Sequence, residues 1–172
     1  MSDVAAAPRV IIVMGVAGAG KTLVGSALAQ ALGWTFYDAD DFHSPENVAK
    51  MHRGIGLTDA DRAPWLATLR DVIDRVIRDG RNAVLACSAL KESYRQALTP
   101  GNAPDGTVRF VYLDVPADVL RKRLEHRQHH YAPPELLDSQ LATLEPPRDA
   151  IRVDGTLPPG DIVTAVRAAL RL

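Results

Sequence analysis

A glycine-rich segment near the start of the chain has the residue types and spacing of a phosphate-binding loop. Residues 15–22 read Gly-Val-Ala-Gly-Ala-Gly-Lys-Thr and match the pattern G-x-x-x-x-G-K-[ST] without a mismatch. Glycines at both ends let the backbone curl until successive N–H groups point at an anion. The Lys21 ammonium can contact the β- and γ-phosphates of a nucleotide, and the Thr22 hydroxyl can ligate Mg²⁺. The sequence therefore predicts a nucleoside triphosphate site whose contacts are Gly15, Gly18, Ala19, Gly20, Lys21 and Thr22.

Carboxylates follow the second predicted strand, in the order Asp38-Ala39-Asp40-Asp41, and His43 comes shortly after them. In a parallel sheet, ligands bind at the carboxyl ends of the strands, so we expect these side chains beside the phosphate loop. A carboxylate there can hold magnesium through water, or accept a hydrogen bond and a proton from a substrate hydroxyl. The alternative is a solvated acidic turn in which an aspartate caps the next helix.

Two groups of basic residues could bind anions. Arg62 lies in the first turn of a predicted helix, where a cation is unfavourable to the helix dipole, so an anion-binding role explains it better. The neighbouring Asp59 is expected to cap that helix. A second basic stretch, residues 121–130, includes Arg123 and Arg127. On a mobile loop it would form a lid that brings arginines to the transferring phosphoryl group, although Arg121 and Lys122 fit a solvated helix face equally well.

The elements that must position these residues alternate between strand and helix. Strands are predicted over 9–14, 34–37, 82–87, 108–113 and 151–153, and helices over 22–32, 45–51, 61–78, 91–98, 116–127, 133–144 and 161–170. Repeated alternation predicts an α/β fold, with a five-stranded parallel sheet covered by helices on both faces. We expect residues 1–8 to be a flexible tail and residues 9–172 a single domain, with a lid at about 124–135.

Composition restricts the partners of the chain. Its 172 residues are enough for one domain with a sizeable core, and its net charge of −1 provides no field that favours nucleic acid or an anionic membrane. The apolar runs are far shorter than the roughly 18 residues that a membrane-spanning helix needs. The single cysteine, Cys87, cannot form an internal disulfide. The N-terminal residues lack a secretory pattern, so a cytoplasmic location is predicted.

The phosphate-binding loop alone does not distinguish kinases from GTPase switches and ATPase motors. The guanine-reading sequence N-K-x-D is absent from the chain, which argues against a GTPase switch. The chain is also too short for most motor ATPase cores. A small kinase that closes over a second substrate remains.

Beyond residue 9, the chain resembles the small gluconate kinases, which are relatives of shikimate and adenylate kinases. Two blocks are specific to that family: Asp-Arg-x-Pro-Trp-Leu at 61–66 and Cys-Ser-Ala-Leu-Lys at 87–91. Other family-like features are Asp38-x-Asp40-x-x-His43, Asn47-x-x-Lys50-Met51, Arg123-Leu124-x-x-Arg127-x-x-His130-Tyr131 and Ser139-Gln140. The chain departs from the family pattern at Ala17 and Ala19, where serines are common, at Gly56, where proline is expected, and at Tyr131, where phenylalanine is usual.

The resemblance implies transfer of a phosphoryl group from ATP, with Mg²⁺, to the terminal hydroxyl of D-gluconate. The 6-phospho-D-gluconate formed would feed the pentose phosphate or the Entner–Doudoroff pathway. It also implies a homodimer. The roles it implies are catalysis by Lys21, Asp40 and Arg127, metal binding by Thr22 and Asp38, nucleotide binding by Arg123 and Arg127 besides the loop, and acceptor binding by Asp40, His43, Arg62, Ser88, Lys91, His130 and Gln140.

Two alternatives stay open at this point. The first is a kinase for another small hydroxy acid such as shikimate, or for a nucleoside monophosphate. Shikimate kinases carry a Gly-Gly-Gly turn after the third strand, where this chain has Cys87-Ser88-Ala89-Leu90. The second is a catalytically idle module that senses nucleotides, against which the intact Lys21, Thr22, Asp40 and Arg127 argue.

Overall fold

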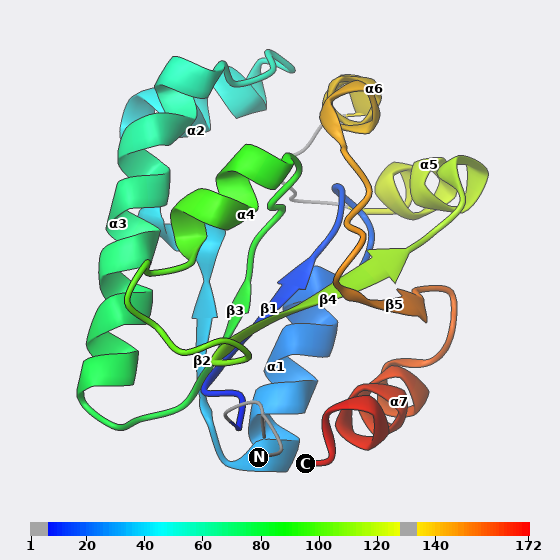
Figure 1. Ribbon diagram of the computed structural model, residues 1–172. Helices are drawn as coiled ribbons and strands as arrows, with labels where there is room; N and C mark the ends of the chain where they lie inside the picture. Colours follow the sequence, from blue (N-terminus) through cyan, green and yellow to red (C-terminus); the bar gives the residue numbers. More distant parts are fainter. Residues whose placement is uncertain (1–6, 128–133) are drawn as a thin grey trace.

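A five-stranded parallel sheet forms the centre of the protein, in the strand order β2-β3-β1-β4-β5. The structure is a computed structural model and describes residues 7–127 and 134–172 (Figure 1). The prediction of five parallel strands is confirmed. Their bounds are Val10–Met14 (β1), Thr35–Asp38 (β2), Ala83–Ala86 (β3), Val108–Asp114 (β4) and Ile151–Asp154 (β5).

The central strand β1 reads Val-Ile-Ile-Val-Met, and all five of its residues are buried. It pairs with β3 on one side and with β4 on the other, with Val10 opposite both Ala83 and Val108. A strand buried on both faces needs helices on both sides of the sheet, which explains its continuous apolar sequence. The helices are Lys21–Leu32 (α1), Pro45–His52 (α2), Asp59–Arg78 (α3), Glu92–Leu98 (α4), Ala117–Glu125 (α5), Pro134–Thr143 (α6) and Pro159–Leu170 (α7).

Local capping contacts set the start of the helices near the site. The Ser44 hydroxyl accepts a hydrogen bond from the Asn47 backbone N–H and so caps the start of α2. Helix α3 begins at Asp59, two residues before the predicted start. There, the Thr58 hydroxyl accepts from the Asp61 N–H while the Asp61 carboxylate accepts from the Thr58 N–H. Because of this reciprocal capping box, α3 starts two residues earlier than predicted, and its cap is Thr58 and not the expected Asp59.

One short element was not predicted. Residues Ala39–Phe42 form a 3₁₀ helix directly after β2, with the Asp38 carboxylate accepting a hydrogen bond from the Asp40 N–H at its start. This turn redirects the chain at the carboxyl end of β2. In Figure 1, α2 and α6 lie beyond one end of the sheet, whereas the C-terminus lies at the other end.

Two predictions on organisation fall partly outside the described residues. The tail was predicted over 1–8 and the lid over about 124–135, whereas residues 1–6 and 128–133 are not described. Both stay predictions. Within the described residues, no helix is both long and apolar enough to cross a membrane.

Candidate active site

A cavity of about 520 Å³ opens at the carboxyl ends of the strands. Its walls come from the phosphate-binding loop after β1, the start of α1, the segment after β2, Ser88 after β3, the start of α3, and α6. Segments that are far apart in the sequence therefore meet around one space. This is the edge of a parallel α/β sheet where ligands bind.

The phosphate-binding loop has the conformation that its glycines predict. Gly18 and Gly20 have φ angles of 85° and 96°, a region that residues with a side chain rarely adopt. Helix α1 begins directly after Gly20, and no side chain caps its first N–H groups. The positive end of α1 and its open amides thus face the cavity, ready for an anion. The Lys21 ammonium donates to the Val16 carbonyl at 3.1 Å, and burial lowers the pKa of Lys21 against the opposing effect of Asp40.

Arg123 contacts the side of the phosphate-binding loop that faces away from the cavity. Its guanidinium donates to the carbonyls of Gly18 (3.1 Å), Ala19 (3.4 Å) and Gly155 (2.8 Å). Arg123 is not among the residues that line the cavity, although the sequence placed it with the nucleotide. Arg127, two residues beyond α5, does line the cavity; burial lowers its pKa, and so does the nearby charge of Arg123.

Three polar residues connect the loop to the end of β2. The Thr22 hydroxyl donates to Asp38 Oδ2 at 2.8 Å, and Asp38 Oδ1 accepts from the Asp40 N–H at 3.0 Å. Hydroxyl and carboxylate oxygens are the ligands that Mg²⁺ prefers, and Mg²⁺ in phosphoryl-transfer sites uses one or two carboxylates together with the substrate phosphates. The described residues contain no group of three or more His, Cys, Asp or Glu that could hold a metal without such help. The site therefore fits a metal that arrives with a nucleotide.

The carboxyl of Asp40 faces the cavity near Lys21. The Asp40 side chain is exposed to solvent through the cavity, but the surrounding protein desolvates the carboxyl enough to raise its pKa. The positive charge of Lys21 acts in the opposite direction and limits this rise. A carboxyl with a raised pKa is a better proton acceptor once it is ionised, which suits a group that binds a hydroxyl.

His43 is fixed as a neutral ring. It stacks on Trp65 with ring centroids 4.2 Å apart and an interplanar angle of 14°. The Trp65 indole N–H donates to the Ala39 carbonyl at 2.7 Å, so Trp65 is itself held in place. Burial, with a further contribution from the charge of Arg62, lowers the pKa of His43 to about 4. Its ring is therefore available at neutral pH as a hydrogen-bonding group without charge.

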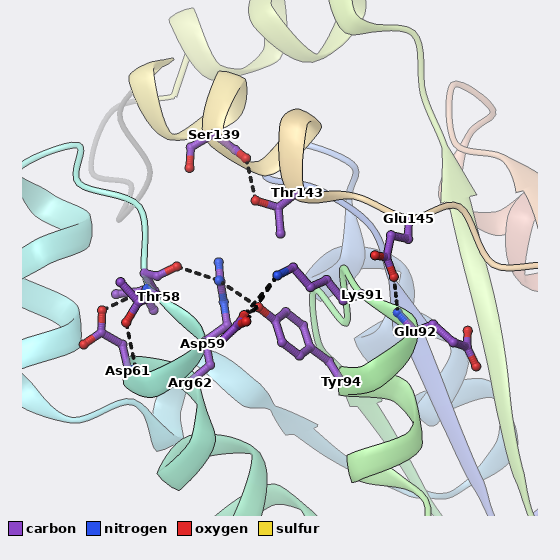
Figure 2. A network of polar contacts seen from close by, with 11 residues as sticks. Thr58, Asp59, Asp61, Arg62, Lys91, Glu92, Tyr94, Ser139, Thr143 and Glu145 are labelled. Carbon is purple, nitrogen blue, oxygen red and sulfur yellow. Dashed lines mark hydrogen bonds and ion pairs between the residues drawn. The ribbon is translucent and has the colours of Figure 1, made fainter.

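A network of polar contacts at the start of α3 and α4 surrounds Arg62 (Figure 2). Arg62 Nη1 donates to the Leu57 carbonyl at 2.6 Å and to the Tyr94 hydroxyl at 3.2 Å. The Tyr94 hydroxyl donates in turn to Asp59, and Lys91 forms an ion pair with the same carboxylate at 3.1 Å. Arg62 lines the cavity and is 8% exposed. Lys91 does not line it, so the structure brings only one of these two predicted anion-binding residues to the cavity.

The remaining predicted residues divide between the cavity and the undescribed segment. Ser88 lines the cavity, and its carbonyl accepts from the Gly15 N–H at 3.4 Å. Gln140 lines it from α6, and its side-chain oxygen accepts from the Ala17 N–H at 2.7 Å. His130 lies outside the described residues.

Several cavity residues were not predicted from the sequence. Trp65, which is buried in the hydrophobic core, and Met51 both line the cavity. Ser139 also lines it, close to Gly56, where an added Cβ would lie 2.4 Å from the Ser139 hydroxyl oxygen. The sequence signal that could have identified Ser139 as a cavity residue was its position next to Gln140.

Known proteins match this chain over most of its length. The family described as "AAA domain" matches residues 10–147. A protein from Gluconobacter oxydans named "Gluconokinase" is 49% identical, over 91% of this chain and 87% of its own. A mouse protein named "Probable gluconokinase" is 46% identical, over 96% and 99%. The chain belongs to the gluconokinase family.

Solved structures agree with membership of the gluconokinase family. A structure titled as a gluconokinase from Sinorhizobium meliloti superimposes with a TM-score of 0.83 at 43% identity, covering 96% of this chain and 93% of that one. A shikimate kinase from Aquifex aeolicus has a TM-score of 0.59 at 19% identity, a likeness of fold alone. Like other members of the gluconokinase family, the protein is a nucleotide-dependent kinase built on a phosphate-binding-loop fold.

Proposed function

We propose that this protein transfers the γ-phosphoryl group of ATP to the terminal hydroxyl of D-gluconate and forms 6-phospho-D-gluconate. One observation carries the proposal: a single cavity is lined by the phosphate-binding loop, by the carboxyl of Asp40 and by Arg62, a residue that is 8% exposed. These groups match a triphosphate, an attacking hydroxyl and a carboxylate, respectively. The names of its relatives support gluconate as the acceptor.

In the proposed reaction, Lys21 and the open amides of the loop hold the β- and γ-phosphates. Thr22 and Asp38 would hold Mg²⁺, whose charge neutralises the phosphate oxygens when it is bound. Asp40 accepts a hydrogen bond from the terminal hydroxyl of gluconate and orients it for in-line attack. Phosphoryl transfer has a loose transition state, so this orientation matters more than strong base catalysis. Arg127 offers positive charge to the transferring group.

The acceptor is expected to extend from Asp40 to Arg62. A guanidinium binds a carboxylate with two parallel N–H···O bonds, which Lys cannot do. His43, Ser88 and Gln140 line the space between and supply hydrogen-bonding groups for the hydroxyls of a polyol. The resemblance to gluconate kinases implies that His130 also binds the acceptor, whereas Lys91, to which it assigned the same role, does not line the cavity.

A coupled ADP-release assay with Mg-ATP and a panel of acceptors tests this function. The panel contains gluconate, shikimate, glycerate, AMP and CMP. We expect saturable turnover on gluconate alone. Turnover on another acceptor would keep the phosphate site and overturn the acceptor assignment.

The Lys21→Ala variant separates a kinase from a nucleotide sensor. In a kinase, loss of the ammonium that contacts the phosphates lowers turnover by several orders of magnitude, because the charge stabilises the transition state. Wild-type protein that binds ATP and turns over no acceptor would indicate a sensor. In that case, Lys21→Ala would weaken ATP affinity only.

We further propose that the protein is cytoplasmic, a reducing compartment that suits its single cysteine, and that it forms a homodimer, as the family resemblance implies. Light scattering coupled to size-exclusion chromatography measures its mass. A mass near 18.6 kDa, that of one chain, would contradict the dimer.

A further inference from the structure

Arg62 is anchored by one of its three nitrogens only. An arginine side chain has five N–H donors, and Nη1 carries two of them. Both Nη1 donors are used, one by the Leu57 carbonyl and the other by the Tyr94 hydroxyl. Nε and Nη2 have no partner among the described residues. No buried side-chain nitrogen or oxygen of those residues lacks a partner, so Nε and Nη2 are not buried atoms. Since Arg62 lines the cavity, these two nitrogens are open to it.

The open edge of Arg62 is the one that a carboxylate fits. The Nε–H and Nη2–H bonds are parallel and lie in one plane, which is the fork that pairs with two carboxylate oxygens. Arg95 is a useful contrast, since it is also buried (4% exposed) and lies in α4, one residue beyond Tyr94. All three of its nitrogens have partners: Glu92, the Ala89 carbonyl and the Glu145 carbonyl. Arg95 is thus a structural arginine, whereas Arg62 keeps three of its five donors available.

The Tyr94 hydroxyl decides which edge of Arg62 remains open. A tyrosine hydroxyl has one proton, and it donates this proton to the Asp59 carboxylate. Its oxygen must therefore accept from Arg62, which can only donate. Lys91 holds Asp59 by an ion pair, and the Arg62 guanidinium carbon lies 5.3 Å from the centre of the Tyr94 ring. Figure 2 shows the side chains of Arg62, Tyr94 and Lys91 converging around Asp59.

We propose that Tyr94, oriented by the Asp59–Lys91 ion pair, is the positioning residue that aims the Nε–Nη2 edge of Arg62 at the acceptor carboxylate and so sets selectivity for an acidic acceptor. The inference rests on the proposed function, because it requires that an acidic polyol binds in this cavity.

The charge distribution explains why a tyrosine stands between Asp59 and Arg62. A carboxylate in direct contact with Arg62 would neutralise its charge and compete with the substrate. Here the negative charge of Asp59 is balanced by Lys91, and only a neutral hydroxyl contacts Arg62. Burial and the hydrogen bond to Asp59 raise the pKa of Tyr94, while hydrogen bonds from Tyr94 and Lys91 lower that of Asp59. The proton accordingly stays on Tyr94 at neutral pH.

The test compares gluconate with gluconamide, a neutral acceptor with the same hydroxyls. The kcat/KM ratio of the two acceptors is measured for the wild type and for Tyr94→Phe, which keeps the ring and removes the hydroxyl. We expect the ratio to fall about tenfold in the variant, with the change in the KM for gluconate. A tenfold change corresponds to the free energy of about one hydrogen bond to a charged group. The KM for ATP should change less than about twofold.

Two further variants separate positioning from stability. Asp59→Ala removes the acceptor that orients the Tyr94 hydroxyl, and it should lower the same ratio with the same KM pattern. Arg95→Lys disturbs the neighbouring structural arginine and should lower the melting temperature without altering the ratio. A ratio that stays unchanged in Tyr94→Phe and Asp59→Ala, while the wild type phosphorylates gluconate, would overturn this inference alone. A wild type that fails to phosphorylate gluconate would overturn the proposed function and the inference together.

Discussion

The Thr22 hydroxyl donates a 2.8 Å hydrogen bond to Asp38 Oδ2 and thereby connects the phosphate-binding loop to the carboxyl end of β2. Asp38 also begins the 3₁₀ helix that carries Asp40. The Asp38 carboxylate thus links Asp40, which would bind the acceptor hydroxyl, to Thr22, which would bind the metal. Both oxygens of Asp38 are used in this connection.

The Asp38→Asn variant should require more magnesium. Asparagine keeps an oxygen that can accept from the Asp40 N–H, but it removes the charge that would attract Mg²⁺. We expect the Mg²⁺ concentration for half-maximal rate to rise about tenfold, as for the loss of one charge-assisted contact. Asp41→Asn, a neighbouring cavity carboxylate, is the control and should change it less than about threefold. Equal magnesium dependence in Asp38→Asn and the wild type would exclude Asp38 as a metal-binding residue.

A glycine inside α1 permits the close approach that joins Thr22 to Asp38. A Cβ at Gly25 would lie 2.9 Å from Phe36 Cε2 on β2, closer than real contacts allow. Gly25→Ala should therefore destabilise the protein and lower kcat/KM, although alanine is the better helix former by about 1 kcal/mol. Thermal denaturation and the coupled assay measure the two effects.

Phe36→Leu provides the matched partner for Gly25→Ala. It shortens the side chain that the new methyl group would meet. The double variant should lose less stability than the sum of the two single variants, because the clash is absent. Strict additivity would show that Gly25 and Phe36 do not limit the approach of α1 to β2.

The raised pKa of Asp40 predicts opposite effects on activity and on stability. Activity requires the ionised carboxyl, so kcat/KM should fall as pH decreases through this raised pKa. Asp40→Asn should lower kcat at least about 100-fold. Because the folded protein binds the Asp40 proton more tightly than the unfolded chain, ionised Asp40 opposes folding above its unfolded pKa. The variant should thus melt at a higher temperature than the wild type at pH 7, and a lower melting temperature would contradict the assignment.

His43 should titrate far below an ordinary histidine. Its pKa of about 4, against 6.5 in the unfolded chain, means that the unfolded state binds the proton more tightly. The His43 contribution to stability is therefore complete above pH 6.5 and is lost as pH falls toward 4. An NMR titration of the ring Cε1–H follows this directly, with His43→Gln identifying the signal. A midpoint near 6.5 would show that the ring is not held neutral by burial.

The sequence predicts features that depend on local spacing. The phosphate-binding loop, the apolar strand β1 before it and the helix α1 after it follow from one contiguous stretch of sequence. The helix and strand order then determines the parallel sheet and the edge at which ligands bind. This is why the structure brings together Lys21, Thr22, Asp38, Asp40, His43, Arg62, Ser88, Arg127 and Gln140 around one cavity.

Contacts between distant segments could not be predicted in this way. The stacking of His43 on Trp65 depends on how the 3₁₀ helix approaches α3. The different partners of Arg62 and Arg95 are not visible in the sequence, where both are basic residues within predicted helices. Lys91 likewise resembled an anion-binding residue until its ion pair with Asp59 was located. Tertiary packing decides which of these cationic side chains is paired within the protein and which keeps donors for a ligand.

The guanidinium of Arg123, behind the phosphate-binding loop, has a consequence for nucleotide affinity. By binding the carbonyls of Gly18 and Ala19, it fixes the orientation of the peptide groups on the side away from the cavity. The loop therefore loses its conformational entropy when the chain folds and not when the nucleotide arrives. Affinity for ATP thus depends in part on a residue on the opposite face of the loop from the phosphates.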